Sequence, residues 1–207
     1  GRVLLQTVVV ARDSWQPDVD PGPADRSQAV LRELLRASSK LGVPGETLTT
    51  VSAEPMPEIA RVAKLHRCES VLLGLSEISD DSHDTPLEGL LGQLETDVVV
   101  LRAAENWQLP ETKRILVPVA GRGGHDYLLA RLLASFSRQQ QCLVTFLRVV
   151  PNNIDAIDFR RARRDLERVA HDNTFGNSEQ VLVKSDDPVD VITKLAGDQL
   201  VILGVQR

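Results

Sequence analysis

Short apolar runs alternate along the whole sequence with stretches in which apolar residues recur every three to four positions. A run of about four to eight apolar residues is typical of a buried strand, and the longer spacing is typical of an amphipathic helix. The first half therefore predicts strands and helices in strict alternation. Strands are expected at 3–10, 46–51, 71–74 and 98–101, and helices at 29–41, 57–65 and 87–94.

The second half repeats the alternation. Strands are expected at 115–119, 143–150, 180–183 and 200–204, and helices at 126–137, 157–170 and 189–196. Strands that alternate with helices predict an α/β fold with parallel sheets. The segment between the halves, which carries Trp107 and Pro110, is interpreted as a linker. We therefore expect a first unit at 1–104, a linker at 105–113 and a second unit at 114–207.

The two halves also resemble one another. Residues 54–60 match residues 186–192 in character, and both lead through a helix to an apolar strand that ends in glycine, at Gly74 and Gly204. This long-period similarity indicates one domain copied in tandem. The first copy lacks a counterpart of 115–137, and the second lacks a counterpart of 87–101. Because a missing strand exposes backbone donors and acceptors, each copy is expected to need residues outside this sequence or shelter from its neighbour. We expect the natural polypeptide to be longer at both ends.

Composition narrows the class of protein. The sequence is 42% hydrophobic but only 3% aromatic, which suits parallel strands buried between helices. The net charge of −5 gives no basic face for nucleic acid. One basic run, 160–164, is interrupted and flanked by acidic residues and predicts a solvated helix face with internal ion pairs. No apolar run approaches the about 20 residues of a membrane helix, and no signal peptide is visible. We expect a cytoplasmic protein with no membrane span in this chain.

Few residues suggest catalysis or metal binding. Cys68 and Cys142 lie far apart and are expected to be buried, reduced thiols. The four histidines, His66, His83, His125 and His171, have no spacing of a helical metal site. No nucleophile elbow of the form G-x-S-x-G occurs. The sequence therefore predicts neither catalytic nor metal-ligating residues, and we expect the protein not to be an enzyme.

Several segments resemble the universal stress protein family. Arg114–Gly121, which reads RILVPVAG, resembles the family's opening strand, and the apolar runs that end at Gly74 and Gly204 resemble its fourth strand. Residues 87–101 resemble the last strand-containing unit of the family. The resemblance implies two Rossmann-like units, of the adenine nucleotide alpha hydrolase-like and universal stress protein-like type, in tandem. Each unit would be incomplete at one end.

The nucleotide motifs of the family are degraded in this sequence. Members that bind ATP carry an aspartate in the first strand and a glycine-rich loop after the fourth. Here the aspartate position is Ala120, and the loop after Gly74 is acidic and has no glycine where phosphate would approach. Glycine backbone is what allows such a loop to cradle phosphates. The remaining candidates for a vestigial nucleotide site are Gly121, Arg122, Gly123, Gly124 and Gly204. The alternative interpretation of residues 121–124 is a plain turn.

Tandem units with decayed nucleotide motifs resemble the cytosolic carboxy-terminal domains of prokaryotic transporters of the amino acid–polyamine–cation superfamily, including cation–chloride cotransporter relatives. This resemblance implies a regulatory and assembly domain that binds no cofactor and is tethered to the inner membrane through a preceding transmembrane domain. It also implies contact with that domain or a homodimer formed through the apolar strand 98–101. The alternative is a universal stress protein that binds ATP or AMP. A hydrolase or transferase on the same scaffold is a third, weaker interpretation, because it rests on fold analogy alone.

Overall fold

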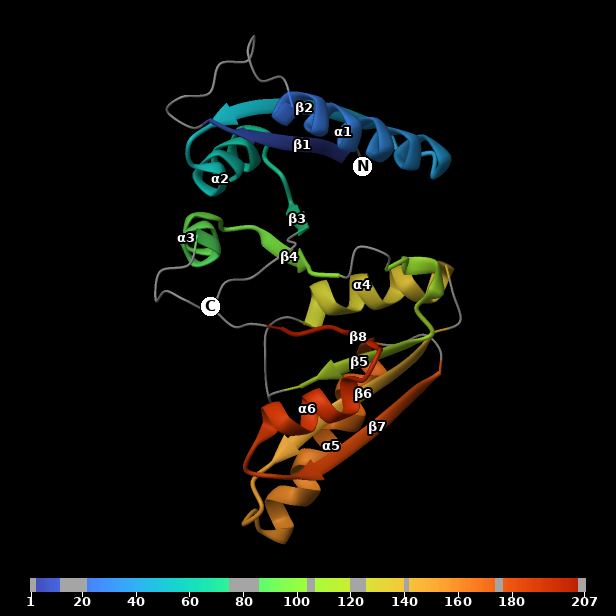
Figure 1. The fold of residues 1–207 in the computed structure, drawn as a ribbon. Coiled ribbons are helices and arrows are strands. Elements are labelled where there is room, and N and C mark those ends of the chain that lie inside the picture. Colours follow the sequence, from blue (N-terminus) through green and yellow to red (C-terminus); the bar gives the residue numbers. More distant parts are fainter. Residues whose placement is uncertain are drawn as a thin grey trace. The chain divides into compact units, whose positions relative to one another are not determined.

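The computed structural model describes residues 3–11, 22–74, 86–103, 107–119, 126–139, 142–173 and 177–204. The chain divides into two compact units, Gly1–Ala104 and Glu105–Arg207. Both units consist of parallel strands joined by helices, as the ribbon in Figure 1 shows. The α/β class predicted from the sequence pattern is therefore confirmed.

Unit 2 contains one parallel sheet of four strands in the order β7-β6-β5-β8. Its elements in chain order are the 3-10 helix η1 (Leu109–Glu111), β5 (Arg114–Pro118), α4 (Asp126–Gln139), β6 (Leu143–Val150), α5 (Ala156–Asn173), β7 (Ser178–Lys184), α6 (Pro188–Ala196) and β8 (Leu200–Val201). The strand β5 is central, because it pairs with β6 on one side and with β8 on the other.

The core of unit 2 is formed where β5 and β6 meet the helices α4 and α5. Phe146 of β6 is completely buried, and it belongs to one apolar cluster with Ile115, Leu133 of α4 and Leu166 of α5. All three middle residues of β5 are apolar and buried. A strand that is apolar on both faces must be covered on both, which is the environment of the centre of a parallel sheet.

The last strand of unit 2 is shorter than the sequence expectation. A strand is expected at 200–204, but β8 ends at Val201. It has one neighbouring strand, β5, and the contact ends where the Ile202 amide donates to the Leu116 carbonyl oxygen at 2.9 Å. In the segment expected as a linker, Leu109–Glu111 form η1, and the buried Thr112 accepts a hydrogen bond from the Cys142 thiol at its carbonyl oxygen.

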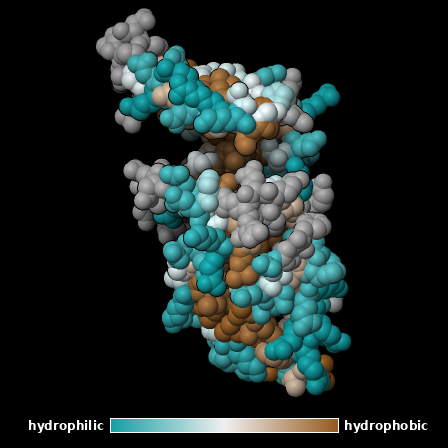
Figure 2. Space-filling model, turned by 90° about the vertical axis from the view of Figure 1, so that its right-hand side faces the viewer, coloured by the Kyte–Doolittle hydropathy of each residue, from teal (hydrophilic) through white to brown (hydrophobic). Residues whose placement is uncertain are grey.

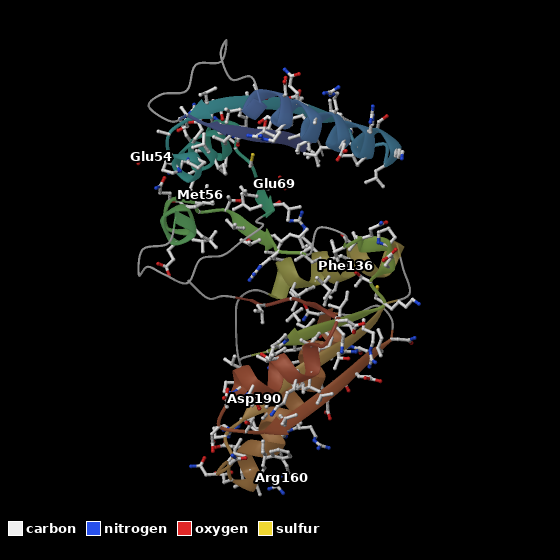
Figure 3. All side chains as sticks on the ribbon, in the orientation of Figure 1. Glu54, Met56, Glu69, Phe136, Arg160 and Asp190 are labelled. Carbon is white, nitrogen blue, oxygen red and sulfur yellow. The ribbon has the colours of Figure 1, made fainter. Side chains whose placement is uncertain are left out.

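Unit 1 contains two separate pairs of parallel strands, β1-β2 and β3-β4. Its elements in chain order are β1 (Val3–Val10), α1 (Gly22–Lys40), β2 (Gly45–Ser52), α2 (Pro55–Leu65), β3 (Ser70–Gly74), α3 (Pro86–Gln93) and β4 (Asp97–Leu101). The core lies where α2 and α3 cover β3 and β4, with Ala60, Leu73, Leu90 and Leu94 buried in one cluster. Met56 of α2 packs against the same cluster and points toward α3 in Figure 3.

The turn that leads into α2 has the same geometry as the turn that leads into α6. The Ser52 hydroxyl accepts from the Glu54 amide at 3.1 Å and donates to the Glu54 carbonyl oxygen at 3.2 Å. Ser185 makes the same two bonds with Asp187, at 3.1 and 3.2 Å. The backbone angles of Glu54 (φ −120°, ψ 88°) and Asp187 (φ −119°, ψ 90°) are almost identical. Ser52 and Ser185 therefore occupy equivalent positions in the two units.

This pair of turns gives a matched test of helix capping. The Asp187 carboxylate accepts from the Asp190 amide at 3.0 Å, whereas the Glu54 side chain makes no capping hydrogen bond. Loss of an N-cap costs about 1 kcal/mol. We therefore expect Asp187→Ala to lower the free energy of unfolding of unit 2 by about that amount. Glu54→Ala is the control and should leave unit 1 unchanged in urea unfolding; equal losses in both would contradict the assignment of the cap.

The equivalence extends into the strands. The Val3 amide donates to the Pro44 carbonyl oxygen at 3.0 Å, and the Val144 amide donates to the Asn177 carbonyl oxygen at 3.2 Å. These bonds stand at equivalent points of the β1-β2 and β6-β7 pairs, so β1 corresponds to β6 and β2 to β7. If β3, which ends at Gly74, corresponds to β8, the pairs β2-β1 and β3-β4 match the strands on the two sides of β5 in unit 2, and the described residues of unit 1 contain no strand at the position of β5.

Candidate functional site

The candidate site of unit 2 is the edge of the sheet where β5 and β8 end. The chain leaves β5 through α4 toward β6 on one side, while β8 lies on the other side of β5. Parallel sheets bind ligands at such a switch in strand order, outside the carboxyl ends of the strands. Gly204 follows β8 at this edge and is exposed. Residues 121–124, which follow β5, lie outside the described residues. The candidate residues predicted from the sequence thus follow two strands, β5 and β8, that are adjacent in the sheet.

Two helix N-termini of unit 2 are occupied by the protein's own carboxylates. Asp155 accepts from the amides of Ile157 and Asp158 at the start of α5, each at 2.8 Å. Asp187 accepts from one amide, that of Asp190, at 3.0 Å at the start of α6. Free amides at a helix N-terminus bind phosphate, and a capping carboxylate takes that place. Sequence reasoning did not identify these caps, although an aspartate directly before Pro188 is a signal for one.

A further carboxylate lies close to these caps. Asp186 accepts from the backbone amide of Asn152 at 3.0 Å and from its side-chain amide at 2.8 Å. This contact joins the residues that follow β6 and β7. The hydrogen bonds from Asn152 lower the pKa of Asp186 below its ordinary value, so the carboxylate stays charged at neutral pH. An anionic ligand approaching the ends of β6 and β7 would meet negative charge.

In unit 1 the corresponding site has only one of its two strands. Gly74 at the end of β3 corresponds to Gly204, but the described residues of unit 1 contain no strand at the position of β5. The acidic loop 75–84, where the sequence argues against ATP, lies outside the described residues. A switch in strand order needs two adjacent strands, so unit 1 presents half of such a site.

The basic run of α5 is a solvated helix face, as expected. Arg161 pairs with Asp158 at 2.8 Å and Arg168 with Asp165 at 3.2 Å, and both arginine side chains are largely exposed. Arg160 lies at the outer side of α5 in Figure 3. Arg163 and Lys184 lie over the ring of Phe159, at 5.9 and 5.1 Å from its centroid. The charged side chains of this face thus interact with one another or with the Phe159 ring. Ion pairs at an exposed surface contribute little to the stability of the fold.

Within the described residues, no group of three or more histidine, cysteine, aspartate or glutamate side chains could hold a metal ion. His66 is the C-cap residue of α2 and His171 lies in the last turn of α5. His83 and His125 lie outside the described residues. Neither cysteine forms a disulfide, and Cys68 is half-buried and Cys142 buried.

Cys142 is unsuited to nucleophilic chemistry. Burial raises the pKa of its thiol, and the thiol donates to the Thr112 carbonyl oxygen at 3.0 Å. A thiolate is the reactive form, so reaction should wait for unfolding of unit 2. Since the folded-state pKa is raised, the neutral thiol's contribution to stability is present below an ordinary pKa of 9.0 and is lost as the pH rises past it. In a Cys68→Ser variant we expect a thiol reagent to label Cys142 only as fast as unit 2 opens. Complete labelling of the native protein within seconds would contradict this.

None of the helices in the described parts of the chain has the length and apolar character required to cross a lipid bilayer.

No protein-family model matches the sequence, and no curated protein matches it. Solved structures do match. A crystal structure of a universal stress protein from Archaeoglobus fulgidus DSM 4304 is 15% identical, with 96% of this chain and 73% of that chain covered and a TM-score of 0.58. A second universal stress protein structure from Archaeoglobus fulgidus is 20% identical over 45% of this chain and 76% of that chain, with a TM-score of 0.40. The first likeness confirms the expected Rossmann-like, universal stress protein-like fold.

Proposed function

We propose that this chain, which has the fold of universal stress proteins, is a non-catalytic regulatory and assembly domain of the cytoplasm. The observation that carries the proposal is the open sheet of unit 1. Among the described residues, β1 pairs only with β2, and β3 pairs only with β4. An apolar strand with an unpaired edge is a template for another stretch of polypeptide. A domain that works by association has a use for such edges, whereas a self-contained enzyme has none.

Apolar side chains at the surface of both units support the same proposal. Figure 2 shows apolar atoms reaching the surface in the part that holds β1, β2 and α1. Leu72 of β3 is 68% exposed. In unit 2, Leu203 is 62% and Val189 of α6 is 70% exposed, whereas Met56, the equivalent of Val189 on α2, packs on a core to which α3 contributes. Large apolar residues gathered at unfinished parts of a fold mark association surfaces.

The proposed context is a membrane transporter for ions or amino acids, to which the domain would be tethered at the inner membrane. This rests on the resemblance of tandem units with decayed nucleotide motifs to the carboxy-terminal domains of such transporters. The test is made on the natural polypeptide that contains these residues. Removal of residues 1–207 should change substrate flux or oligomeric state. If flux and oligomeric state are both unchanged, the regulatory role is wrong.

Self-association through β4 is part of the proposal. Its residues Val98–Leu101 are apolar and half-buried, and within the described residues β4 pairs only with β3. A lysine on an edge strand opposes pairing between sheets. We therefore expect light scattering to find a dimer and Val99→Lys to weaken it. Val30→Lys, on the exposed face of α1, is the matched control. A clean monomer at high concentration would exclude self-association.

The alternative is an adenine nucleotide-binding stress protein, and one observation favours it. Gly204 and residues 121–124 follow the adjacent strands β8 and β5, at the edge where such folds bind nucleotides. Calorimetry with ATP and AMP distinguishes the two proposals. Our proposal predicts no binding tighter than about 100 µM, which corresponds to about −5.5 kcal/mol. Tighter binding that Arg122→Ala abolishes would favour the alternative.

A further inference from the structure

The residues of β1 that face the open edge can be identified from unit 2. Because Ser52 and Ser185 are equivalent, the preceding residues, Val51 of β2 and Lys184 of β7, are equivalent as well. Val51 pairs with Val9 of β1 and Lys184 pairs with Val150 of β6, and both Val9 and Val150 are buried. When the residues are counted back from Val9 and Val150, residues 3–6 of β1 correspond to residues 144–147 of β6. In unit 2 those four residues of β6 pair with β5. The residues 3–6 of β1 therefore line the place where unit 2 holds β5.

The burial of these residues differs between the two units, and among the described residues of unit 1 only β2 pairs with β1. Val144 and Phe146 of β6 are almost completely buried beside β5. Their counterparts in unit 1 are Val3, which is 42% exposed, and Leu5, which is half-buried. The amides of Val144 and Val3 both point toward the outer strand of their sheet. Since successive amides of a strand point to opposite sides, those of Leu4 and Gln6 point into the open place.

Comparison of β3 with β8 also indicates an open strand position in the described part of unit 1. Counting back from the glycines, Leu72 corresponds to Ile202 and Val71 to Val201. Val201 pairs with Leu116 of β5, and Ile202 packs against the core that α4 helps to form. Leu72 is instead 68% exposed. The described residues of unit 1 thus contain no counterpart of β5 or α4, which in unit 2 pair with β6 and β8 and cover Ile202.

We propose that the edges of β1 and β3, together with the exposed side chain of Leu72, bind a partner segment. The partner segment is an apolar strand followed by an amphipathic helix, supplied by polypeptide outside residues 1–207. Its strand enters parallel between β1 and β3, with its second apolar residue opposite Leu4 and Val71, as Leu116 stands opposite Thr145 and Val201. Its helix covers Leu72. The inference rests on the proposed assembly function and names the surface that serves it.

The chemistry of the occupant follows from the repeat. Ile115, Leu116 and Val117 of β5 are buried, so a strand in this position is apolar on both faces. The helix α2 contacts β1 as α6 contacts β5 and β6, so one face of the open place already has its cover. A second copy of the chain is a poor occupant. To offer its own β5, that copy would withdraw these three residues from the centre of its unit 2 core.

A peptide with the sequence of residues 113–139 of this chain is the probe, because it contains the strand and helix that unit 2 uses. Added to the 207-residue protein, it should bind in a 1:1 ratio. Hydrogen exchange at the amides of Leu4, Gln6 and Leu72 should slow by about tenfold or more. A control peptide with aspartate at the positions of Leu116 and Val117 should have no effect.

Two matched variants locate the binding site. Leu72→Asp should weaken peptide binding by about tenfold or more, whereas Leu203→Asp, at a similarly exposed leucine of unit 2, should not. Val3→Asp is a second variant at the same surface, and slow amide exchange in β4 shows that each variant remains folded. No binding at about 1 mM peptide, or protection only at β8, overturns the proposal. Because the flux experiment removes both units, it can succeed when this one fails, so the two proposals fail separately.

Discussion

Phe146→Ala is expected to lower the free energy of unfolding of unit 2 by about 3–5 kcal/mol, because truncation of a buried aromatic residue removes its apolar contacts and leaves a cavity. Phe146 lies on β6 with no exposed surface and packs among residues of β5, α4 and α5. All the elements around it belong to one sheet and its cover, so the cavity cannot close by movement of a loop. Urea unfolding followed by hydrogen exchange at β5 and β6 measures the loss.

The matched control for this prediction is Leu203→Ala. Leu203 belongs to the same unit but is 62% exposed, so its truncation should change stability by about 0.5 kcal/mol or less. Equal losses for Phe146→Ala and Leu203→Ala would mean that the core of unit 2 is not where the structure places it.

Leu90→Ala is expected to destabilise unit 1 by about 2–5 kcal/mol. Leu90 of α3 has no exposed surface and packs against Ala60 and Ala63 of α2 and Leu73 of β3. Unit 1 forms its core on the α2 and α3 side of β3 and β4, since the opposite side carries the exposed Leu72. Among the described residues this cluster holds α3 against β3 and β4, so the loss should be seen as rapid amide exchange throughout both strands.

Leu72→Ala is the control for this second prediction, since it removes the same atoms from an exposed site in the same unit. It should change stability by about 0.5 kcal/mol or less. A large loss in Leu72→Ala would show that Leu72 is covered in solution and would remove an argument for the open surface.

The sequence pattern predicted the order and type of the helices and strands. Buried parallel strands contain short apolar runs, and amphipathic helices have apolar residues at every third or fourth position. The run Val98–Leu101 and the run Leu143–Val150 both became strands, β4 and β6. The sequence suggested the repeat through the likeness of 54–60 to 186–192, but the structure shifts this alignment by one residue, so that Glu54-Pro55 corresponds to Asp187-Pro188.

Other features depend on tertiary contacts, which the pattern of apolar and polar residues does not reveal. The strand β8 stops at Val201 although the apolar run continues to Leu203, and within the described residues it pairs with β5 alone. The expected linker contributes the buried Thr112 because the Cys142 thiol lies against its carbonyl oxygen. The candidate residues 121–124 were chosen by resemblance to a family motif, and of the candidates only Gly204 lies in the described residues.

The open edge of β1 is tested most directly by residue-resolved hydrogen exchange on the native 207-residue protein. Amides of β1 should alternate: Leu5, Thr7 and Val9, directed at β2, exchange slowly, while Leu4, Gln6 and Val8 exchange at least about a hundredfold faster. Along β6, Thr145 and Leu147 should exchange as slowly as Phe146, because β5 and β7 lie on its two sides. Uniformly slow exchange along β1 would contradict the open edge of β1, since it would show that the place between β1 and β3 is already filled.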